Sequence, residues 1–356
     1  MKKLVLAFLA LIVLLGLYFF LSPSKVQPLA YDPPAKPEIS GVLAPNDKLT
    51  RAELLGLGQV HGPEDIALAG DGAVYCGCAD GAIRIIGTDG RVSTFAETGG
   101  RPLGMVFDRD DNLIVCDAVK GLLSVDPKGH ITVLATQADG VPFKFTDDLD
   151  IASDGRIYFT DASMLYGIDE YLYDLLAHRP LGRFLVYDPE SKKVKVLLKD
   201  LYFANGVALS QKEDFVLVNE TYAYRIKRYW LRGPKAGTSE IFIENLPGFP
   251  DNISSNRRGT FWLAMYTVRN DIMDRIHPSP LLKTVLSKLP RFLWPKPQPY
   301  GLVLALDESG AIRESLHDPT GEHLKVITSA KEWNGFLYLG SLHNDRVGKY
   351  RLSSAR

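Results

Sequence analysis

The sequence predicts an all-β fold, a six-bladed β-propeller that carries an N-terminal transmembrane helix and two helical insertions. Three observations support this prediction. Short strands around Asp-Gly-type turns recur along the chain with a period of about 40 residues or more. An uncharged apolar run stands at the N-terminus. The 356 residues, 46% of them hydrophobic, are enough to bury a sizeable core.

The first element is the apolar run of residues 4–21, LVLAFLALIVLLGLYFFL, which contains neither a charge nor a proline. As a helix it would be about 27 Å long, enough to cross the hydrocarbon core of a bilayer. Lys2 and Lys3 precede it and favour a cytoplasmic N-terminus. A cleaved signal peptide is the alternative, but its apolar core would be shorter and a small-x-small site would follow it. We therefore expect an uncleaved single-pass anchor.

This interpretation divides the chain into three segments. Residues 1–22 form the transmembrane signal anchor. Residues 23–37, with their five prolines, form a semi-rigid spacer. Residues 38–356 form the propeller, which the orientation of the anchor places on the non-cytoplasmic side of the membrane, in a periplasmic, lumenal or extracellular space.

The propeller repeats begin with two units that align almost without gaps, GPEDIALAGDGAVYCGCADGAIRIIGTDGRVSTFAE from Gly62 and RPLGMVFDRDDNLIVCDAVKGLLSVDPKGHITVLAT from Arg101. Four later units open with FTDDLDIASDGRIYFTDAS, FANGVALSQKEDFVLVNE, FPDNISSNRRGTFWLAMY and EHLKVITSAKEWNGFLYLGS. Six units of four strands each indicate six blades. Residues 38–59 are expected to supply the strand that closes the ring, because closure pairs strand edges that would otherwise be exposed.

Two insertions interrupt the blades and look helical, residues 169–178 (DEYLYDLLAH) and residues 280–294 (PLLKTVLSKLPRFLW). Each is expected to overhang one face of the disc. The second insertion has apolar residues at roughly helical spacing, with two lysines and an arginine between them. It would be a lid over an active-site mouth, a contact with the membrane surface or a helix packed on a blade. The sequence leaves these three alternatives open.

The candidate site follows from the repeats, because the first strand of every blade lines the central channel and its opening residue should point to the axis. In chain order these residues are Glu64, Leu103, Asp147, Asn205, Asp251 and either Glu322 or His323. Four of the first five carry a side-chain oxygen and three of those are acidic, so they would repel one another unless a cation lay between them. We predict a metal site formed by Glu64, Asp147, Asn205 and Asp251, with Asn252 as a further ligand.

The chemistry of this ligand set favours calcium, which takes about 6–8 oxygen ligands, although another divalent cation would also fit. Zinc is disfavoured because these positions contain no paired histidines or cysteines. The alternative, for any one of these residues taken alone, is that a polar side chain at a strand start only caps a turn.

Four motifs carry a resemblance to a known family: GPED (62–65), FANGVALS (203–210), NETYAYRIKRYWL (219–231) and LPGFPDNIS (246–254). In these motifs the chain resembles the strictosidine synthase-like family, which includes adipocyte plasma membrane-associated protein. The resemblance extends from about residue 55 to residue 352. That family belongs to a wider superfamily of calcium-dependent propellers with the gluconolactonases and paraoxonases.

The superfamily resemblance implies calcium ligands at Glu64, Asn205 and Asp251, with Asn252 close by. Asp147 stands where many relatives have asparagine. The alignment of the repeats and the family resemblance therefore select the same residues by different routes.

Two departures from the family pattern bear on the reaction. In plant strictosidine synthases the catalytic glutamate lies two residues after the histidine of a GEH-type motif, and Lys325 stands at that position here, after His323. The acid/base group of the alkaloid condensation is therefore missing. Paraoxonases use a histidine near the start of the second blade, where this chain has Leu103.

The expected reaction is hydrolysis of a small ester or lactone, which the membrane anchor suggests is lipophilic. Calcium would polarise the carbonyl group. Asp251 is the candidate catalytic residue that orients or deprotonates the attacking water, and His323 is a secondary proton carrier near the mouth of the channel. The rival hypothesis is a strictosidine synthase-like propeller without synthase activity, acting as a membrane-tethered module that binds a ligand or partner. Calcium would then only hold together the inner ends of the blades at the axis, which we call the hub.

Composition excludes several other classes. The 41 basic and 42 acidic side chains give a net charge of −1, so no basic footprint for nucleic acid is expected. Three cysteines, Cys76, Cys78 and Cys116, are too few for a disulfide scaffold in a chain of this length. We expect them to be small buried side chains. No GxSxG sequence is present, which argues against a serine hydrolase. The sequence does not indicate an oligomeric state.

Overall fold

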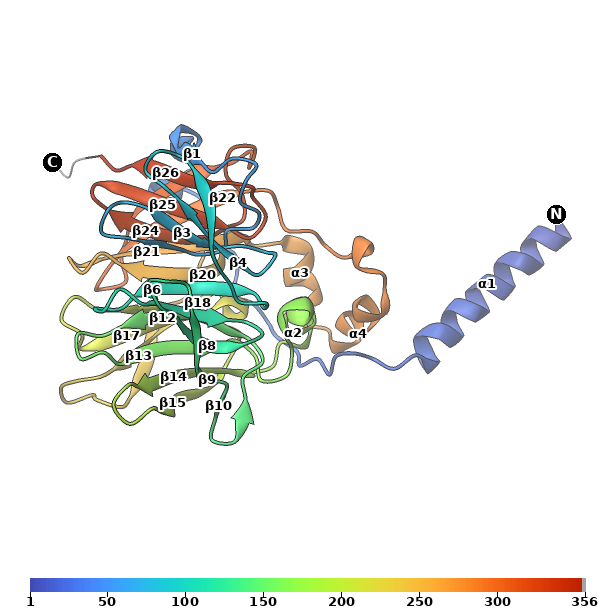
Figure 1. The fold of residues 1–356 in the computed structure, drawn as a ribbon. Helices are drawn as coiled ribbons and strands as arrows, with labels where there is room; N and C mark the ends of the chain where they lie inside the picture. Colours follow the sequence, from blue (N-terminus) through green and yellow to red (C-terminus); the bar gives the residue numbers. More distant parts are fainter. Residues whose placement is uncertain (354–356) are drawn as a thin grey trace.

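The computed structural model describes residues 1–353, whose main strands form six four-stranded antiparallel sheets. These sheets are the six blades of a β-propeller, so the predicted fold class is confirmed (Figure 1). Residues 354–356, the end of the predicted propeller segment 38–356, lie outside the described part of the chain.

Blades 1 to 5 run in chain order from an inner strand at the axis to an outer strand at the rim, and in blade 6 the outer strand is the N-terminal β1. Blades 1 and 2 consist of β2 (Ile66–Leu68), β3 (Val74–Gly77), β4 (Ala82–Ile86), β5 (Val92–Glu97), β6 (Pro102–Phe107), β7 (Leu113–Asp117), β8 (Gly121–Val125) and β9 (Ile131–Ala135). Blades 3 and 4 consist of β12 (Thr146–Ile151), β13 (Ile157–Asp161), β14 (Gly182–Asp188), β15 (Lys193–Leu201), β16 (Ala204–Leu209), β17 (Phe215–Glu220), β18 (Arg225–Trp230) and β19 (Ser239–Ile243). Blades 5 and 6 consist of β20 (Gly248–Ser255), β21 (Thr260–Val268), β22 (Gly301–Asp307), β23 (Ile312–Asp318), β24 (Ile327–Trp333), β25 (Phe336–Ser341), β26 (Val347–Arg351) and β1 (Glu53–Leu55).

The ring is closed by β1, which pairs antiparallel with β26 and brings Glu53 opposite Lys349. The prediction that residues 38–59 supply the closing strand is therefore confirmed. Two short 3-10 helices, η1 (Gly41–Leu43) and η2 (Lys48–Arg51), precede this strand. A third, η4 (Thr221–Ala223), joins β17 to β18, and a hairpin of β10 (Gln137–Ala138) and β11 (Val141–Pro142) connects blades 2 and 3.

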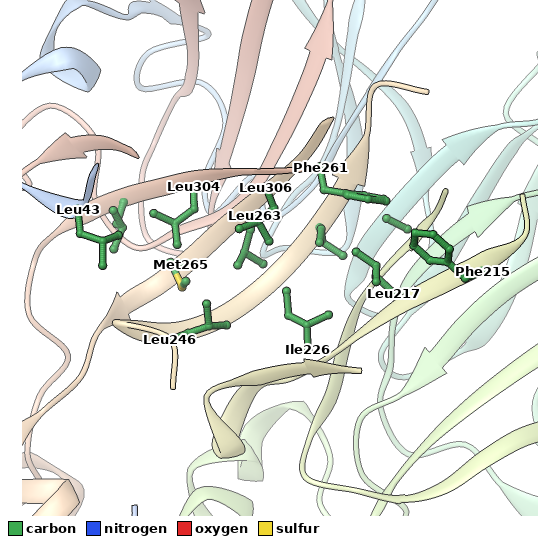
Figure 2. Packing of buried hydrophobic residues seen from close by; sticks show 13 residues of the cluster. Leu43, Phe215, Leu217, Ile226, Leu246, Phe261, Leu263, Met265, Leu304 and Leu306 are labelled. Carbon is green, nitrogen blue, oxygen red and sulfur yellow. The ribbon is translucent and has the colours of Figure 1, made fainter. Parts of the chain in front are cut away.

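The hydrophobic core lies between neighbouring blades, where every second residue of a strand faces the next sheet. Figure 2 shows this packing between blades 4 and 5, where Phe215 and Leu217 of β17 meet Phe261 and Leu263 of β21. The residue between the last two, Trp262, is buried on the opposite side of β21, against blade 6. Both faces of the sheet are thus covered, and each fully buried large side chain contributes about 1.5–3 kcal/mol to stability.

Five helical elements cover one face of the disc and are called the cap below. They are η3 (Ile168–Glu170), α2 (Tyr171–Ala177), α3 (Asp271–Ile276), α4 (Pro280–Lys288) and η5 (Arg291–Leu293). Both predicted insertions are thus helical and lie on one side of the disc, where Figure 1 places α2, α3 and α4 together. Helix α3 is an addition that the sequence analysis missed; Asn270 caps it by accepting from the backbone N–H of Ile272 and Met273.

The N-terminal helix α1 (Lys2–Leu21) projects from the cap side of the disc (Figure 1). It is long and apolar enough to cross a membrane. Residues 22–36, called the strap below, follow it. The backbone N–H of Leu29 donates to the carbonyl oxygen of Ala177 at 2.9 Å, and that of Tyr31 donates to His277 at 3.0 Å. The strap, which covers most of the predicted semi-rigid spacer of residues 23–37, therefore lies against the cap.

Candidate functional site

Six inner strands bring one side chain each to a cavity of about 110 Å³ beneath the cap. These side chains are Glu64, Leu103, Asp147, Asn205, Asp251 and Thr328. The structure thus brings together all five of the positions expected in blades 1 to 5. In blade 6 the inner strand β24 begins only at Ile327, so Thr328 takes the position for which Glu322 or His323 was expected.

Irregular strand pairing aims these side chains. In β12 the pairing register shifts between Thr146 and Leu149, which places Asp147 and Asp148 in the irregular stretch. Blades 2, 4, 5 and 6 have a register shift at the corresponding place. A β-bulge re-aims side chains that a regular strand would send to its two faces. The same local irregularity therefore recurs at the start of the inner strand in five of the six blades, all except blade 1.

In blades 1 and 3 the residue after the cavity-lining position fastens the inner strand to that of the next blade. Asp65 Oδ2 accepts from the backbone N–H of Met105 in the next blade at 2.7 Å, and Asp148 Oδ2 accepts from Val207 at 2.9 Å. Gly206 occupies this position in blade 4, where an added Cβ would lie 2.5 Å from the backbone oxygen of Asp251. The hub is therefore too tightly packed there for any side chain.

A lysine near the axis was missed by the sequence analysis. Lys331 of β24 places its Nζ 2.5 Å from Asp65 Oδ2 and donates to the Met105 carbonyl oxygen at 2.7 Å. Together with Asp148 it lines a second cavity, of about 1100 Å³, at the other end of the channel. The signal in the sequence was a lysine that directly follows the small or apolar residues at the start of an inner strand. The structure buries those residues, Ile327 to Ala330.

The polar side chains under the cap form two pairs. Asn205 Nδ2 donates to Asp251 Oδ1 at 2.8 Å, and Asn252 Nδ2 donates to Glu64 Oε1 at 3.1 Å. Three buried oxygens of this group, Glu64 Oε2, Asn205 Oδ1 and Asn252 Oδ1, have no hydrogen-bond partner among the described residues. A buried oxygen without a partner is costly, so these atoms mark a place where a donor or a cation would be stabilised.

Burial and mutual repulsion act together on the carboxyl groups. Burial raises the pKa of Glu64 and of Asp147 well above the ordinary values, and the nearby Asp251 raises both further. Burial also raises the pKa of Asp251 to about 8. The protein alone therefore favours protonated carboxyl groups here, and a cation would take the place of those protons.

No three histidine, cysteine, aspartate or glutamate side chains in residues 1–353 stand close enough to hold a metal ion by themselves. The three hub carboxylates therefore do not form a complete ligand set without help. Asn205 and Asn252 would have to contribute their amide oxygens. A half-turn of each amide group would exchange its donor nitrogen for the unpartnered oxygen.

His323 does not reach the cavity. Its Nε2 lies 2.7 Å from the carbonyl oxygen of Ala52, and its backbone N–H donates to Asp318 Oδ2 at 3.0 Å, so it holds the loop before blade 6 in place. The histidine that does approach the cavity is His343, whose Nε2 lies 3.4 Å from the hydroxyl of the cavity-lining Tyr266. Neither residue stands at a repeated position, so the blade alignment gave no signal for this pair.

The cap forms the roof of the cavity with mostly apolar side chains. From η3 and α2 come Ile168, Tyr171, Leu172 and Leu175, and from α3 and the residues after η5 come Met273, Pro295, Lys296 and Pro297. The propeller adds aromatic walls, among them Phe145, Phe203 and Phe249. The hub carboxylates are thus covered by a roof that suits an apolar ligand.

Asp174 of α2 is the buried acid of the cap. Neither carboxylate oxygen forms a hydrogen bond within the described residues. Burial raises its pKa from 3.8 to about 7, although the nearby Ser163 hydroxyl acts in the opposite direction. Between about pH 4 and pH 7 the folded protein therefore keeps a proton that the unfolded chain releases, and this group's contribution to stability falls as the pH rises through that window.

Replacing Asp174 with asparagine is expected to remove this loss, because the amide is neutral at every pH and has nearly the shape of the protonated acid. Asp174→Asn should exceed the wild-type protein in unfolding free energy by about 2 kcal/mol at pH 8, and match it within about 1 kcal/mol at pH 4. Urea unfolding of both proteins at the two pH values measures the difference. A difference that is the same at pH 4 and pH 8 would contradict the assignment.

Comparison with known proteins adds sequence relatives. The family profile described as Strictosidine synthase matches residues 147–234, and the profile described as Strictosidine synthase-like, N-terminal, matches residues 41–86. The chain is 38% identical over 382 residues to adipocyte plasma membrane-associated protein of Rattus norvegicus, an alignment that covers 99% of this chain and 100% of the relative. It is 37% identical over 307 residues to Protein STRICTOSIDINE SYNTHASE-LIKE 6 of Arabidopsis thaliana, with 84% and 81% covered.

Solved structures share the fold at lower sequence identity. A gluconolactonase of Xanthomonas campestris superimposes with a TM-score of 0.63 at 19% identity, covering 94% of this chain and 99% of its own. Regucalcin of Agrobacterium tumefaciens, described as a calcium-binding protein, has a TM-score of 0.58 at 13% identity, with 84% and 90% covered. At these identities the likeness is one of fold.

Proposed function

The chain belongs to the strictosidine synthase-like family that includes adipocyte plasma membrane-associated protein, and from this premise we propose that it is a calcium-dependent hydrolase of esters or lactones, anchored in a membrane by α1. The observation that carries the proposal is the meeting of Glu64, Asp147, Asn205 and Asp251 in one cavity beneath an apolar roof. The gluconolactonase and the calcium-binding regucalcin that share the fold support the same reaction class and the same ion.

The hub residues fit calcium by the chemistry of their atoms. The set offers carboxylate and amide oxygens and no sulfur or ring nitrogen, which is the preference of a hard cation. The unpartnered oxygens of Glu64, Asn205 and Asn252 would gain a partner, and the repulsion that raises the pKa of the carboxyl groups would be relieved. Glu64, Asp147, Asn205 and Asp251 would hold the ion, with Asn252 beside them.

A bound calcium ion would supply positive charge that stabilises the oxyanion developing on the substrate carbonyl. Asp251 would orient the attacking water and accept its proton. Burial and the charge of Asp65 raise the pKa of Asp251 to about 8 despite the hydrogen bond from Asn205, whereas a nearby cation lowers the pKa of a carboxyl group. The carboxylate form that can accept a proton therefore depends on the occupied hub. Leu103 and Phe249 would contact the apolar part of the substrate and keep bulk water out.

Tyr266 and His343 replace His323 as the proposed proton path. The Tyr266 hydroxyl lies on the cavity wall and 3.4 Å from His343 Nε2, and His343 lines a separate surface pocket of about 490 Å³. A proton released at the hub would leave through this pair, because the histidine is in contact with solvent.

The reaction is tested with the full chain in detergent, on phenyl acetate and on aliphatic lactones. Hydrolysis is expected in calcium buffer, to be lost on addition of a calcium chelator, and to return when calcium is added in excess. The reason is that removal of the cation leaves the carboxyl groups under the cap protonated. No positive charge then remains there to stabilise the oxyanion. If neither substrate class were turned over in a chelator-sensitive way, the hydrolase proposal would be refuted. If calcium still raised the melting temperature, the rival ligand-binding module would be the better hypothesis.

The proposed location follows from α1 and from the relatives. A helix of this length and apolarity near the N-terminus, together with relatives named as plasma membrane-associated, supports a single-pass anchor. Lys2 and Lys3 favour a cytoplasmic N-terminus, so the propeller would stand on the non-cytoplasmic side.

A further inference from the structure

The distance between α1 and the cap is limited by the chain itself. Helix α1 ends at Leu21, and Val26 is already buried in the core of the cap with Tyr173 and Trp294. Five residues of fully extended chain span at most about 18 Å. If α1 crosses a membrane, the cap must therefore lie within that distance of the membrane surface.

Contacts between α4 and the end of α1 keep the separation below this limit. Lys288 Nζ at the end of α4 donates to the carbonyl oxygen of Phe19 at 2.6 Å, and the Tyr18 hydroxyl donates to the Lys288 carbonyl oxygen at 2.9 Å. The backbone of α4 is thus in direct contact with the end of α1 that would emerge from the bilayer. Figure 1 shows α4 as the cap helix on the side of α1.

The first turn of helix α4 has the opposite exposure to that of a helix that faces water. Lys283 is 0% exposed, and its Nζ donates to the carbonyl oxygen of Leu29 in the strap at 2.7 Å. Leu281 is 71% exposed. A water-facing helix would bury the leucine and expose the lysine. The outer surface of α4 is therefore suited to a non-aqueous surrounding.

The 3-10 helix η5, which follows α4 in the cap, carries further exposed apolar side chains. Phe292 is 73% exposed, and Leu293 beside it is also exposed, as is Leu282 of α4. After Leu21, Phe292 and Leu281 are the most exposed large apolar side chains of the described residues. We call Leu281, Leu282, Phe292 and Leu293 the apolar patch. Clustered apolar exposure of this kind marks an interaction site rather than ordinary surface variation.

Basic residues border the apolar patch. Lys25 of the strap, Arg291 of η5 and Lys296 are exposed, and Lys288 is half-buried. The acids Asp169 and Glu170 of η3 are the opposing charges nearby, and Arg291 donates to the Asp169 carbonyl oxygen at 2.5 Å. A cationic border around exposed leucine and phenylalanine is complementary to anionic lipid headgroups above acyl chains.

We propose that the apolar patch inserts into the non-cytoplasmic leaflet of the membrane that α1 spans, and that the hub cavity receives its substrate from that leaflet. Pro295, Lys296 and Pro297 line the cavity and follow the apolar patch in sequence, separated from Leu293 by one residue. The same short segment of chain therefore connects the proposed lipid contact to the lining of the cavity. The second half of this inference rests on the proposed hydrolase; the first half, membrane insertion, does not.

Insertion is tested on the full chain in vesicles of phosphatidylcholine and phosphatidylglycerol, with a fluorophore on a single introduced cysteine. The native cysteines are buried and free. Probes at Phe292→Cys and Leu282→Cys are compared with a probe at Val133→Cys, an exposed apolar position on the outer strand β9. Blue-shifted emission and strong quenching by nitroxide-labelled lipid are expected at residues 282 and 292 but not at 133. Equal quenching at all three positions, or none at 292, would overturn membrane insertion.

A second copy of the chain is the other occupant that the test distinguishes. A blue-shifted probe at 292 that nitroxide lipid does not quench, and that reverts on dilution in detergent, would mean that another protein covers the apolar patch and would refute the proposal.

The substrate route is tested separately. Leu281→Ser combined with Phe292→Ser is expected to lower hydrolysis of a vesicle-borne long-chain ester at least fivefold and to leave hydrolysis of soluble phenyl acetate within twofold. Equal losses on both substrates would refute delivery from the leaflet. Absence of turnover on either substrate in the wild-type protein would instead count against the proposed hydrolase, and the probe experiment would still decide insertion.

Discussion

Replacing Asp251 with alanine is expected to lower calcium-dependent ester hydrolysis at least about 100-fold. Asp251 interacts with three of the other candidate ligands, through a hydrogen bond from Asn205 and through its charge on Glu64 and Asp147. Its Oδ1 accepts from Asn205 at 2.8 Å, its backbone oxygen accepts from Asn219 Nδ2, and its charge raises the pKa of both Glu64 and Asp147. The variant would lose a ligand and the group that accepts the proton from water. The measurement is kcat/KM on phenyl acetate in saturating calcium, together with calcium titration by calorimetry.

Asp148→Asn is the matched control for this experiment. Asp148 is as deeply buried as its neighbour Asp147, but its Oδ2 accepts from the backbone N–H of Val207 and it lines the cavity at the opposite end of the channel. Asparagine keeps an oxygen that can accept this bond, so calcium affinity should change much less than in Asp251→Ala or Asp147→Ala. Wild-type calcium affinity in all three variants would show that the ion does not bind at these residues.

The blades and most of the hub could be predicted because the chain repeats itself. Along strands such as β21 and β22, alternate side chains face the two neighbouring blades in turn. This pattern is visible in the amino-acid sequence. Positions that repeat can be aligned, which selected Glu64, Asp147, Asn205 and Asp251 before their distances were known. The sixth position failed because Lys325 and Val326 interrupt the alternation, and the inner strand starts one residue before Thr328.

The residues that were missed owe their place to contacts outside the repeat. Tyr266 meets His343 across the boundary between blades 5 and 6, and only the packing of one blade on the next brings them together. The three alternatives left open for residues 280–294 depend on which side of α4 faces outward. Lys283 settles that orientation through one backbone carbonyl of the strap, a contact 254 residues away in sequence. No periodicity within the helix encodes such a partner.

Replacing Lys331 with methionine is expected to lower the unfolding free energy by about 3 kcal/mol. Asp65 is 0% exposed, and its Oδ1 already lacks a partner within the described residues, while Oδ2 receives the ammonium group of Lys331 at 2.5 Å. Methionine would fill a similar volume but leave the carboxylate buried without its counter-ion. Removing one partner of a buried ion pair costs about 3–5 kcal/mol, and the low end applies because the lysine side chain is 18% exposed. Urea unfolding at pH 7 in calcium buffer measures the loss.

The double variant Asp65→Asn with Lys331→Met separates loss of the ion pair from loss of packing. Asparagine keeps an oxygen for the backbone N–H of Met105 but carries no charge that needs an ammonium group. Replacing both partners of a buried pair by neutral groups costs little in comparison with breaking it, so the double variant should recover about 2 kcal/mol of the loss. If Lys331→Met alone were as stable as the wild-type protein, the lysine would not neutralise the charge of Asp65. A double variant no more stable than Lys331→Met would assign the loss to packing. With the ion pair intact, the acids at the far end of the channel have a cation of their own, which leaves the carboxylates under the cap as the place where calcium is needed.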